Sequence, residues 1–245
     1  MKKMIQIILF VFVSVALSAQ TFNYLPAKIN DHQIIEYSEF TLSYNPTHKQ
    51  ADWVAYELTA EEVKATQERC DCFKIDKNIS SDAVSSGDYN SSGFDKGHLC
   101  PAADCNISKQ ANEESFLMTN MSPQLPLFNR GIWSDLEEWV RKQAETYSTV
   151  YVTTGPVFVN NLGALSEKKI TIPGYYYKTL LRFDGEKIKT IAFLIPHVGA
   201  VGKLKDYVVS VNTLETITGI DFYPELDDSV ENKVESQIEL RKWGL

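Results

Sequence analysis

The alternation of hydrophobic and polar residues predicts several strands along the chain. Ala51 to Leu58 and Thr149 to Thr154 have the length and the residue types of strands, and the second is apolar enough to be buried. Tyr175 to Phe183 and Lys187 to Ile195 alternate on either side of Asp184-Gly185, a dipeptide that favours a tight hairpin turn. We therefore expect a long antiparallel hairpin in the second half of the chain.

Helical periodicity is clearest from Phe128 to Tyr147, where apolar residues recur at helical spacing and charges occupy the other face. Glu113 to Met121 predicts a shorter helix that gives way to a loop at Ser122-Pro123. Tyr207 to Thr216 and Val230 to Trp243 predict two further helices. Because strands and helices are mixed without regular βαβ alternation, the sequence indicates an α+β fold.

The first 19 residues have the features of a secretory signal peptide. Lys2 and Lys3 give a positively charged start, an apolar run from Ile7 to Leu17 follows, and small residues lead to Ala19. The run is shorter than the about 20 residues that span a bilayer, which favours a cleaved signal over an uncleaved anchor. We expect cleavage after Ala19, a secreted or periplasmic protein, and a single domain over residues 20–245, since no repeat or flexible linker interrupts that stretch.

The composition is that of a globular but acidic protein. The 245 residues are 44% hydrophobic and carry a formal net charge of −8 at pH 7. Proteins that bind nucleic acid by neutralising many phosphates are normally basic, so the charge alone argues against an extended nucleic-acid-binding surface. It does not exclude an enzyme that contacts its substrate briefly at one metal site.

Four cysteines, Cys70, Cys72, Cys100 and Cys105, lie beyond the predicted signal peptide. An even number in an exported chain favours disulfides. A zinc site is the alternative, but the C-x-C and C-x4-C spacings are not those of the usual zinc-binding pairs. A bond between Cys70 and Cys72 would close a very tight ring, so we expect bridges between the two clusters.

The segment Asp95-Lys96-Gly97-His98 combines an acid, a base, a glycine and a histidine after a polar stretch. A histidine with the ordinary pKa of about 6.5 can act as a general base near neutral pH. By itself this pattern is weak evidence, because a lone histidine near an aspartate is more often structural.

A second group of polar residues contains Asn120, Asn129 and Glu137. Asn129 stands where the main helix is expected to begin, so it is either a helix cap or an oxygen ligand for a hard cation such as Mg²⁺. On one regular helix, Glu137 would lie about 12 Å along the axis and roughly 80° around it from Asn129. That separation favours an indirect role for Glu137 at a metal, the alternative being a solvated surface glutamate.

Several ordered motifs together indicate a family. They are ADWVAYELT at 51–59, Arg69, SGFDKGHLCPAAD at 92–104, TNMSPQLPLFNRGIWSDLE at 119–137, TTGPVF at 153–158 and IPGYYYKTLL at 172–181. With these motifs the chain resembles the DNA/RNA non-specific endonucleases of the ββα-metal (His-Me finger) superfamily. The resemblance covers most of the chain beyond the predicted signal, and it implies a central, mostly antiparallel sheet flanked by helices.

The resemblance implies a role for each matching residue. His98 would be the general base that activates water, and Asn129 the only direct protein ligand of a Mg²⁺ ion, with Mn²⁺ as an alternative ion. Glu137 would act on that ion through a water, Arg69 would lie near the scissile phosphate, and Asn120 would help to orient His98 or the phosphate region. Because the imidazole must be neutral to accept a proton, activity is expected to rise with pH through its pKa.

The chain departs from the family motif at Lys96, where the family has arginine. Lysine keeps the positive charge but lacks the planar fork that holds a phosphate through two bonds. If Cys70 or Cys72 were bridged to Cys100 or Cys105, the bridge would also bring Arg69 near His98.

The expected function is therefore an exported endonuclease that cuts DNA and RNA without sequence preference and leaves 5′-phosphate ends. It would be a monomer or a homodimer without a membrane partner. The alternative, favoured by Lys96 and by the acidic charge, is an exported binding protein that keeps the fold with weakened or lost catalysis.

Overall fold

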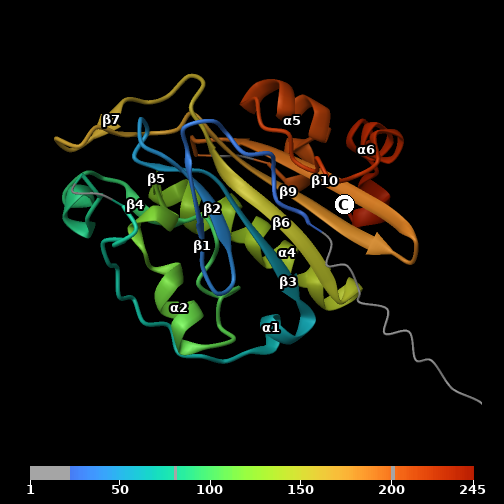
Figure 1. Ribbon diagram of the computed structural model, residues 1–245, viewed down its shortest axis with the longest axis horizontal. Helices are drawn as coiled ribbons and strands as arrows, with labels where there is room; N and C mark the ends of the chain where they lie inside the picture. Colours follow the sequence, from blue (N-terminus) through green and yellow to red (C-terminus); the bar gives the residue numbers. More distant parts are fainter. Residues whose placement is uncertain (1–22, 80–81, 200–201) are drawn as a thin grey trace, which may run out of the picture.

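The computed structural model describes residues 23–79, 82–199 and 202–245, so the predicted signal peptide lies outside the described residues. Its centre is a seven-stranded sheet in the order β1-β2-β3-β6-β9-β10-β11, in which every neighbouring pair is antiparallel (Figure 1). The strands are β1 (Gln33–Glu36), β2 (Thr41–Asn45), β3 (Gln50–Thr59), β6 (Thr149–Val157), β9 (Tyr175–Asp184), β10 (Lys187–Pro196) and β11 (Val208–Val209).

Helices flank this sheet, which confirms the predicted α+β class (Figure 1). They are α1 (Ala60–Lys64), α2 (Lys109–Ser115), α3 (Pro126–Phe128), α4 (Ser134–Tyr147), α5 (Val211–Thr218) and α6 (Asp228–Glu235). Two small ribbons complete the described elements: β4 (Asp95–His98) with β5 (Met121–Gln124), and β7 (Ala164–Leu165) with β8 (Ile170–Thr171). In the described part of the chain, no helix combines the length and hydrophobicity that a bilayer span requires.

The two faces of the sheet carry separate hydrophobic cores, because successive side chains of a strand point to opposite sides. In β3, Val54 and Tyr56 belong to the core that also contains Leu136 and Val140 of α4. The alternate residues of β3, beginning with Trp53, belong to the second core, which α5 covers together with the segment that follows it. The sheet is thus a middle layer between α4 on one face and α5 on the other.

The predicted hairpin is confirmed as β9 and β10, which pair from Asp184↔Lys187 at the turn to Tyr175↔Pro196 at the other end. Gly185 in the turn has φ 61°, in the left-handed region that glycine adopts at little cost. The strands predicted over Ala51 to Leu58 and Thr149 to Thr154 are also confirmed, as β3 and β6.

The helix predicted from Phe128 to Tyr147 is confirmed in outline, but it is not regular. The chain passes from α3 through a π-helical turn, Asn129–Trp133, before α4 begins. Gly131 within that turn has φ −112° and ψ −116°, which are not helical values. Asn129 and Glu137 therefore do not lie on one straight helix, and the separation calculated for such a helix does not apply to them.

The loop predicted at Ser122-Pro123 is wrong, because both residues lie in β5. β5 pairs only with β4, so one of its edges needs no backbone hydrogen bonds. A proline, which lacks an N–H group, is tolerated in such an edge position.

The two helices predicted near the C-terminus are shorter than expected. Ser210 accepts a hydrogen bond from the backbone N–H of Thr213 and so begins α5 after β11, not at Tyr207. The periodic stretch predicted from Val230 to Trp243 is divided between α6 and a separate 3₁₀ turn over Leu240–Trp243.

Candidate active site

The ribbon of β4 and β5 carries His98 at its end, where His98 pairs with Met121. One position earlier along the register, Gly97 lies opposite Ser122, and the buried side chain of Gln124 covers it. A Cβ atom at position 97 would overlap Cδ and Oε1 of Gln124. The glycine before His98 is thus required by close approach and not by a left-handed backbone.

Asp95 connects this ribbon to the start of the α3–α4 segment. Its carboxylate accepts a hydrogen bond from Nδ2 of Asn129 at 3.0 Å and two from Arg130, at 2.9 Å to Nε and 2.7 Å to Nη2. Partial burial opposes ionisation of Asp95, but the hydrogen bonds from Arg130 and Asn129 hold its pKa below the ordinary value. Asp95 is therefore an ionised acceptor that fixes the orientation of the Asn129 amide.

The fixed amide leaves Asn129 suited to a hard cation. With Nδ2 bonded to Asp95, the carbonyl oxygen Oδ1 points elsewhere, and no hydrogen bond to it is formed among the described residues. These residues also contain no group of three or more histidine, cysteine, aspartate or glutamate side chains that could hold a metal ion. A single amide oxygen fits Mg²⁺, which keeps most of its waters and needs few protein ligands when phosphate supplies others.

His98 lies against two aromatic rings. The ring centroid of Phe116 is 4.8 Å away and nearly perpendicular, and that of Phe73 is 5.9 Å away. Nε2 is buried and has no hydrogen-bond partner among the described residues. Burial and the Arg69 guanidinium lower the pKa of His98 to about 3, and Asp71 opposes them weakly. The imidazole is thus neutral at neutral pH, well away from the pKa of about 6.5 that the sequence alone suggested.

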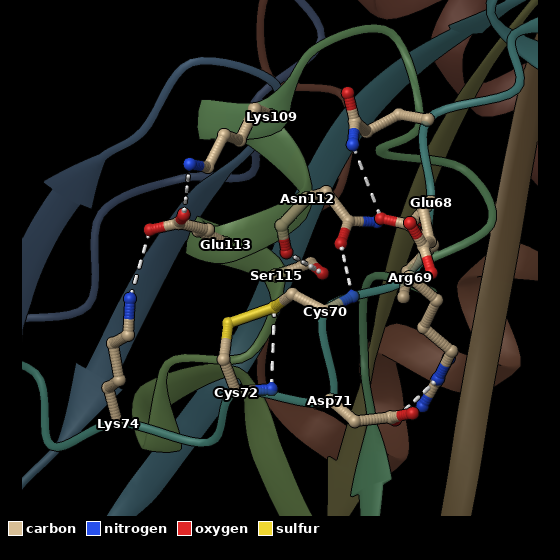
Figure 2. The surroundings of a disulfide bond; sticks show 12 residues. Glu68, Arg69, Cys70, Asp71, Cys72, Lys74, Lys109, Asn112, Glu113 and Ser115 are labelled. Carbon is tan, nitrogen blue, oxygen red and sulfur yellow. Dashed lines mark hydrogen bonds and ion pairs between the residues drawn. A yellow bond between two sulfur atoms is a disulfide. The ribbon is translucent and has the colours of Figure 1, made fainter.

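Two cations flank the same aromatic pair. The guanidinium carbon of Arg69 lies 4.7 Å from the ring centroid of Phe116, and Nζ of Lys96 lies 4.8 Å from that of Phe73. Nε of Arg69 donates to Oδ1 of Asp71 at 2.7 Å (Figure 2). The structure therefore brings Arg69 and Lys96 to the rings that contact His98.

Glu137 lies in the first turn of α4, beside a buried group of charges. Burial raises the pKa of Glu137 to about 7, although the ammonium of Lys178 opposes this shift. Asp104 in the same group accepts hydrogen bonds from Arg141 at 3.1 Å and from the Tyr56 hydroxyl at 3.0 Å. Arg69 lowers the pKa of Glu137 as well as that of His98, so its charge acts on both residues.

Asn120 is fully buried, and its side-chain hydrogen bonds go to the backbone of Cys100 and Ser115. Its side chain holds the backbone of Cys100, accepting from the N–H at 2.9 Å and donating to the carbonyl at 2.9 Å. A further hydrogen bond runs from Nδ2 to the carbonyl of Ser115 at 2.8 Å. Asn120 thus fixes the chain two residues after His98.

The predicted bridges between the two cysteine clusters are wrong. Cys70 and Cys72 form a disulfide with each other on an exposed loop beside α2 (Figure 2). Cys100 and Cys105 are free and fully buried, with their sulfur atoms 3.3 Å apart. Cys100 and Cys105 belong to the hydrophobic core, whereas Cys70 and Cys72 lie at the surface, a difference that the sequence spacing could not reveal.

Sequence reasoning missed several residues of this region: Phe73, Phe116, Gln124, Arg141, Asp104 and Lys178. Two of them carry a local signal. Arg141 stands four residues after Glu137 on the predicted helix, on the same face, and Lys178 is a charge inside a mostly apolar strand. The others lack such a signal, because only the tertiary structure brings Phe73 and Phe116 to His98, Gln124 to Gly97 and Asp104 to Arg141.

Comparisons with known proteins show the family and the fold of the chain. A sequence profile of the DNA/RNA non-specific endonuclease family matches residues 18–229. The chain is similar to a nuclease of Nostoc sp., with 31% identity over 227 residues, covering 87% of this chain and 82% of the relative. It is also similar to mitochondrial endonuclease G of Bos taurus, with 29% identity, covering 79% and 70% respectively. A solved structure of EndoG in complex with EndoGI has a TM-score of 0.75 and 27% identity, covering 80% of this chain and 88% of that one.

Proposed function

Because this chain belongs to the DNA/RNA non-specific endonuclease family, we propose that it is an exported, Mg²⁺-dependent endonuclease that hydrolyses phosphodiester bonds of DNA and RNA and leaves 5′-phosphate ends. One observation carries the proposal. Asp95, three residues before His98 on β4, fixes the amide of Asn129 through its nitrogen and leaves the amide oxygen of Asn129 free. Asn129 thus supplies an oxygen ligand and His98 on β4 supplies a neutral base. The carboxylate of Asp95 links the segments that carry them.

His98 is the general base in this mechanism. Its imidazole is neutral at neutral pH, so a ring nitrogen is available to accept the proton of the attacking water. The low pKa reflects burial and the charge of Arg69. A bound phosphodiester brings a negative charge that opposes both effects, and so raises the proton affinity of His98 when substrate is present.

Arg69 and Lys96 bind the phosphate. Only Nε of Arg69 is used by Asp71, so its terminal nitrogens remain for phosphate oxygens. Lys96 contributes a point charge, and packing against Phe73 limits where that charge can lie. Contacts confined to phosphate give no sequence preference, because the base edges carry the sequence information.

Asn129 would hold the metal through Oδ1, and Glu137 would act through a water. When bound, Mg²⁺ supplies charge neutralisation at the non-bridging and leaving oxygens of the phosphate. Mn²⁺ prefers the same oxygen ligands and is an alternative ion. Lys178 and Arg141 oppose the effect of burial on Glu137 and favour its ionised form.

The test is cleavage of plasmid DNA and of RNA by the protein lacking residues 1–19, with Mg²⁺ and with EDTA. His98→Ala should lower kcat/KM by about 10²–10⁴-fold while the variant remains folded at the assay temperature. His48→Ala, at another partly exposed histidine, is the matched control and should cut normally. The products should accept a 5′ label from a kinase only after phosphatase treatment.

A folded wild-type protein that cuts neither nucleic acid with Mg²⁺ or Mn²⁺ would contradict the proposal. Binding without cutting would instead support the alternative of a binding protein with lost catalysis. Export is tested separately, by N-terminal sequencing of the protein recovered outside the cytoplasm, which should begin at Gln20.

A further inference from the structure

We propose that the Cys70–Cys72 disulfide is a positioning device for Arg69, so that the enzyme reaches full activity only after these two cysteines are oxidised. The proposal rests on the proposed nuclease function. It concerns the loop from Arg69 to Lys74, which lies beside α2 (Figure 2) and whose Arg69 contacts the ring of Phe116.

The disulfide encloses a single residue, Asp71, whose carboxylate orients Arg69. Asp71 has φ 46°, in the left-handed region that a residue with a Cβ atom rarely adopts. In this conformation its Oδ1 accepts the hydrogen bond from Nε of Arg69 at 2.7 Å. The covalent ring between Cys70 and Cys72 restricts the backbone of Asp71 and so favours a conformation that an open chain would seldom populate.

Both ends of the loop are anchored without the disulfide. At the start, the N–H of Cys70 donates to Oδ1 of the buried Asn112 at 3.0 Å. At the end, the N–H of Lys74 donates to the carbonyl of Phe116 at 3.1 Å, and its ammonium pairs with Glu113 at 2.9 Å. The disulfide thus acts on the residues between two fixed points, and Asp71 is the one that it encloses.

The position of Arg69 depends on few other contacts. Its side chain is 51% exposed, and its ion pair in the described part of the chain is the one with Asp71. The remaining contact is with the Phe116 ring, which packs against His98. If Asp71 relaxed to an ordinary backbone conformation, the guanidinium would lose the acceptor that directs it toward the site.

The oxidation is a thiol–disulfide exchange with an external disulfide, either a small-molecule disulfide or that of an oxidoreductase. A thiolate of the pair attacks the external disulfide, which forms a mixed disulfide and releases one external thiol. The second thiolate then attacks the mixed disulfide, so that the Cys70–Cys72 bond forms and the other external thiol is released. The two external thiols carry away the two electrons. Cys70 is exposed and Cys72 partly exposed, whereas Cys100 and Cys105 are buried. In a reducing cytoplasm the pair stays reduced, so a nuclease without sequence preference would be less active before export than after it.

The experiment measures kcat/KM for plasmid DNA with Mg²⁺ in the oxidised wild type and in the double variant Cys70→Ser/Cys72→Ser. We expect a loss of about 10- to 100-fold in the double variant, the size expected when a catalytic group is displaced by about 1 Å. A thiol reductant should lower the wild-type activity by the same factor and leave the double variant unchanged. Because the double variant retains Cys100 and Cys105, its insensitivity excludes them as the source of the effect.

A double-mutant cycle separates positioning from general stability. In an Arg69→Ala background, removal of the disulfide should cause no further loss, since the residue that it positions is absent. Asp71→Asn, which keeps the disulfide, should lower the activity of the wild type but not that of Arg69→Ala.

Unchanged activity of the double variant would overturn this inference alone, and so would an equal loss in the Arg69→Ala background. Failure of the oxidised wild type to cut any nucleic acid would instead contradict the proposed function itself.

Discussion

Nδ2 of Asn129 donates a hydrogen bond of 3.0 Å to Oδ2 of Asp95, which stands three residues before His98 on β4. An asparagine amide can be turned either way, and this bond decides which end faces the carboxylate. The oxygen is left to face away from Asp95, where a cation can reach it. The contact thereby links the orientation of the proposed metal ligand to the strand that carries the proposed base.

Replacing Asp95 by asparagine should weaken metal activation. The variant loses the charge that holds both Asn129 and Arg130, so the Asn129 amide is free to rotate. Loss of a residue that orients a metal ligand typically costs 10- to 100-fold in metal affinity, and we expect a shift of about that size. The measurement is the Mg²⁺ concentration for half-maximal cleavage, together with Mn²⁺ binding by electron paramagnetic resonance. Asp184→Asn, exposed at the hairpin tip, is the control and should leave both values unchanged.

The pH dependence should be governed by Glu137 and not by His98. His98, with a pKa of about 3, stays neutral from pH 5 upward and can accept a proton throughout that range. Glu137, with a pKa of about 7, becomes ionised only as pH rises through that value, and the ionised form is the one that serves the site. Wild-type kcat/KM should therefore rise with pH around 7, and the residual activity of Glu137→Gln should be flat between pH 5 and 7. A rise that persists in Glu137→Gln would assign the titration to another group.

Gly97→Ala should disturb both stability and activity. The added methyl group overlaps the buried side chain of Gln124, and overpacking of this kind typically costs about 1–3 kcal/mol. Shortening the neighbour in Gly97→Ala/Gln124→Ala should restore part of the lost stability, because it removes the overlapping atoms. Urea unfolding of the two variants and the wild type provides the comparison. Equal stability of Gly97→Ala and the wild type would show that Gln124 moves freely.

Glu235→Gln should stabilise the protein at alkaline pH. Burial, together with Glu215, Glu231 and Asp221, raises the pKa of Glu235 to about 8, from an ordinary value of 4.5. The folded state therefore binds a proton that the unfolded state releases between these values, and stability falls as pH rises from about 4.5 to about 8.

The amide of Glu235→Gln removes that dependence. Its unfolding midpoint should exceed that of the wild type at pH 8 and converge with it near pH 4.5. Glu186→Gln, exposed in the β9–β10 turn, should track the wild type at both pH values. A constant difference between Glu235→Gln and the wild type across this range would contradict the assigned pKa.

Much of the fold follows from local patterns. The alternation around Asp184-Gly185 predicted the β9–β10 hairpin, and helical periodicity predicted the segment that includes α4. Predictions failed where a neighbour in space decides the conformation. Pro123 was expected in a loop, but it lies in β5 because pairing with β4 leaves the other edge of that strand without backbone partners.

The candidate site divides in the same way. The chemical groups at His98, Asn129 and Arg69 could be identified from the order and spacing of the motifs, because the sequence shows both directly. The position of Phe116 beside His98 could not, nor could the pairing of Cys70 with Cys72. The first contact joins the end of α2 to β4, and the second depends on the left-handed backbone of Asp71; no local hydrophobic pattern encodes either of them.

By itself, the sequence determined the family and the chemical types available for catalysis. The tertiary structure decided their states: a neutral His98, an Asn129 amide held with its oxygen free, and an Arg69 directed by Asp71. The physical reason is that charge, desolvation and hydrogen bonding act across space over a few ångströms. Residues that are near in space are often far apart in the chain, and only folding brings them together.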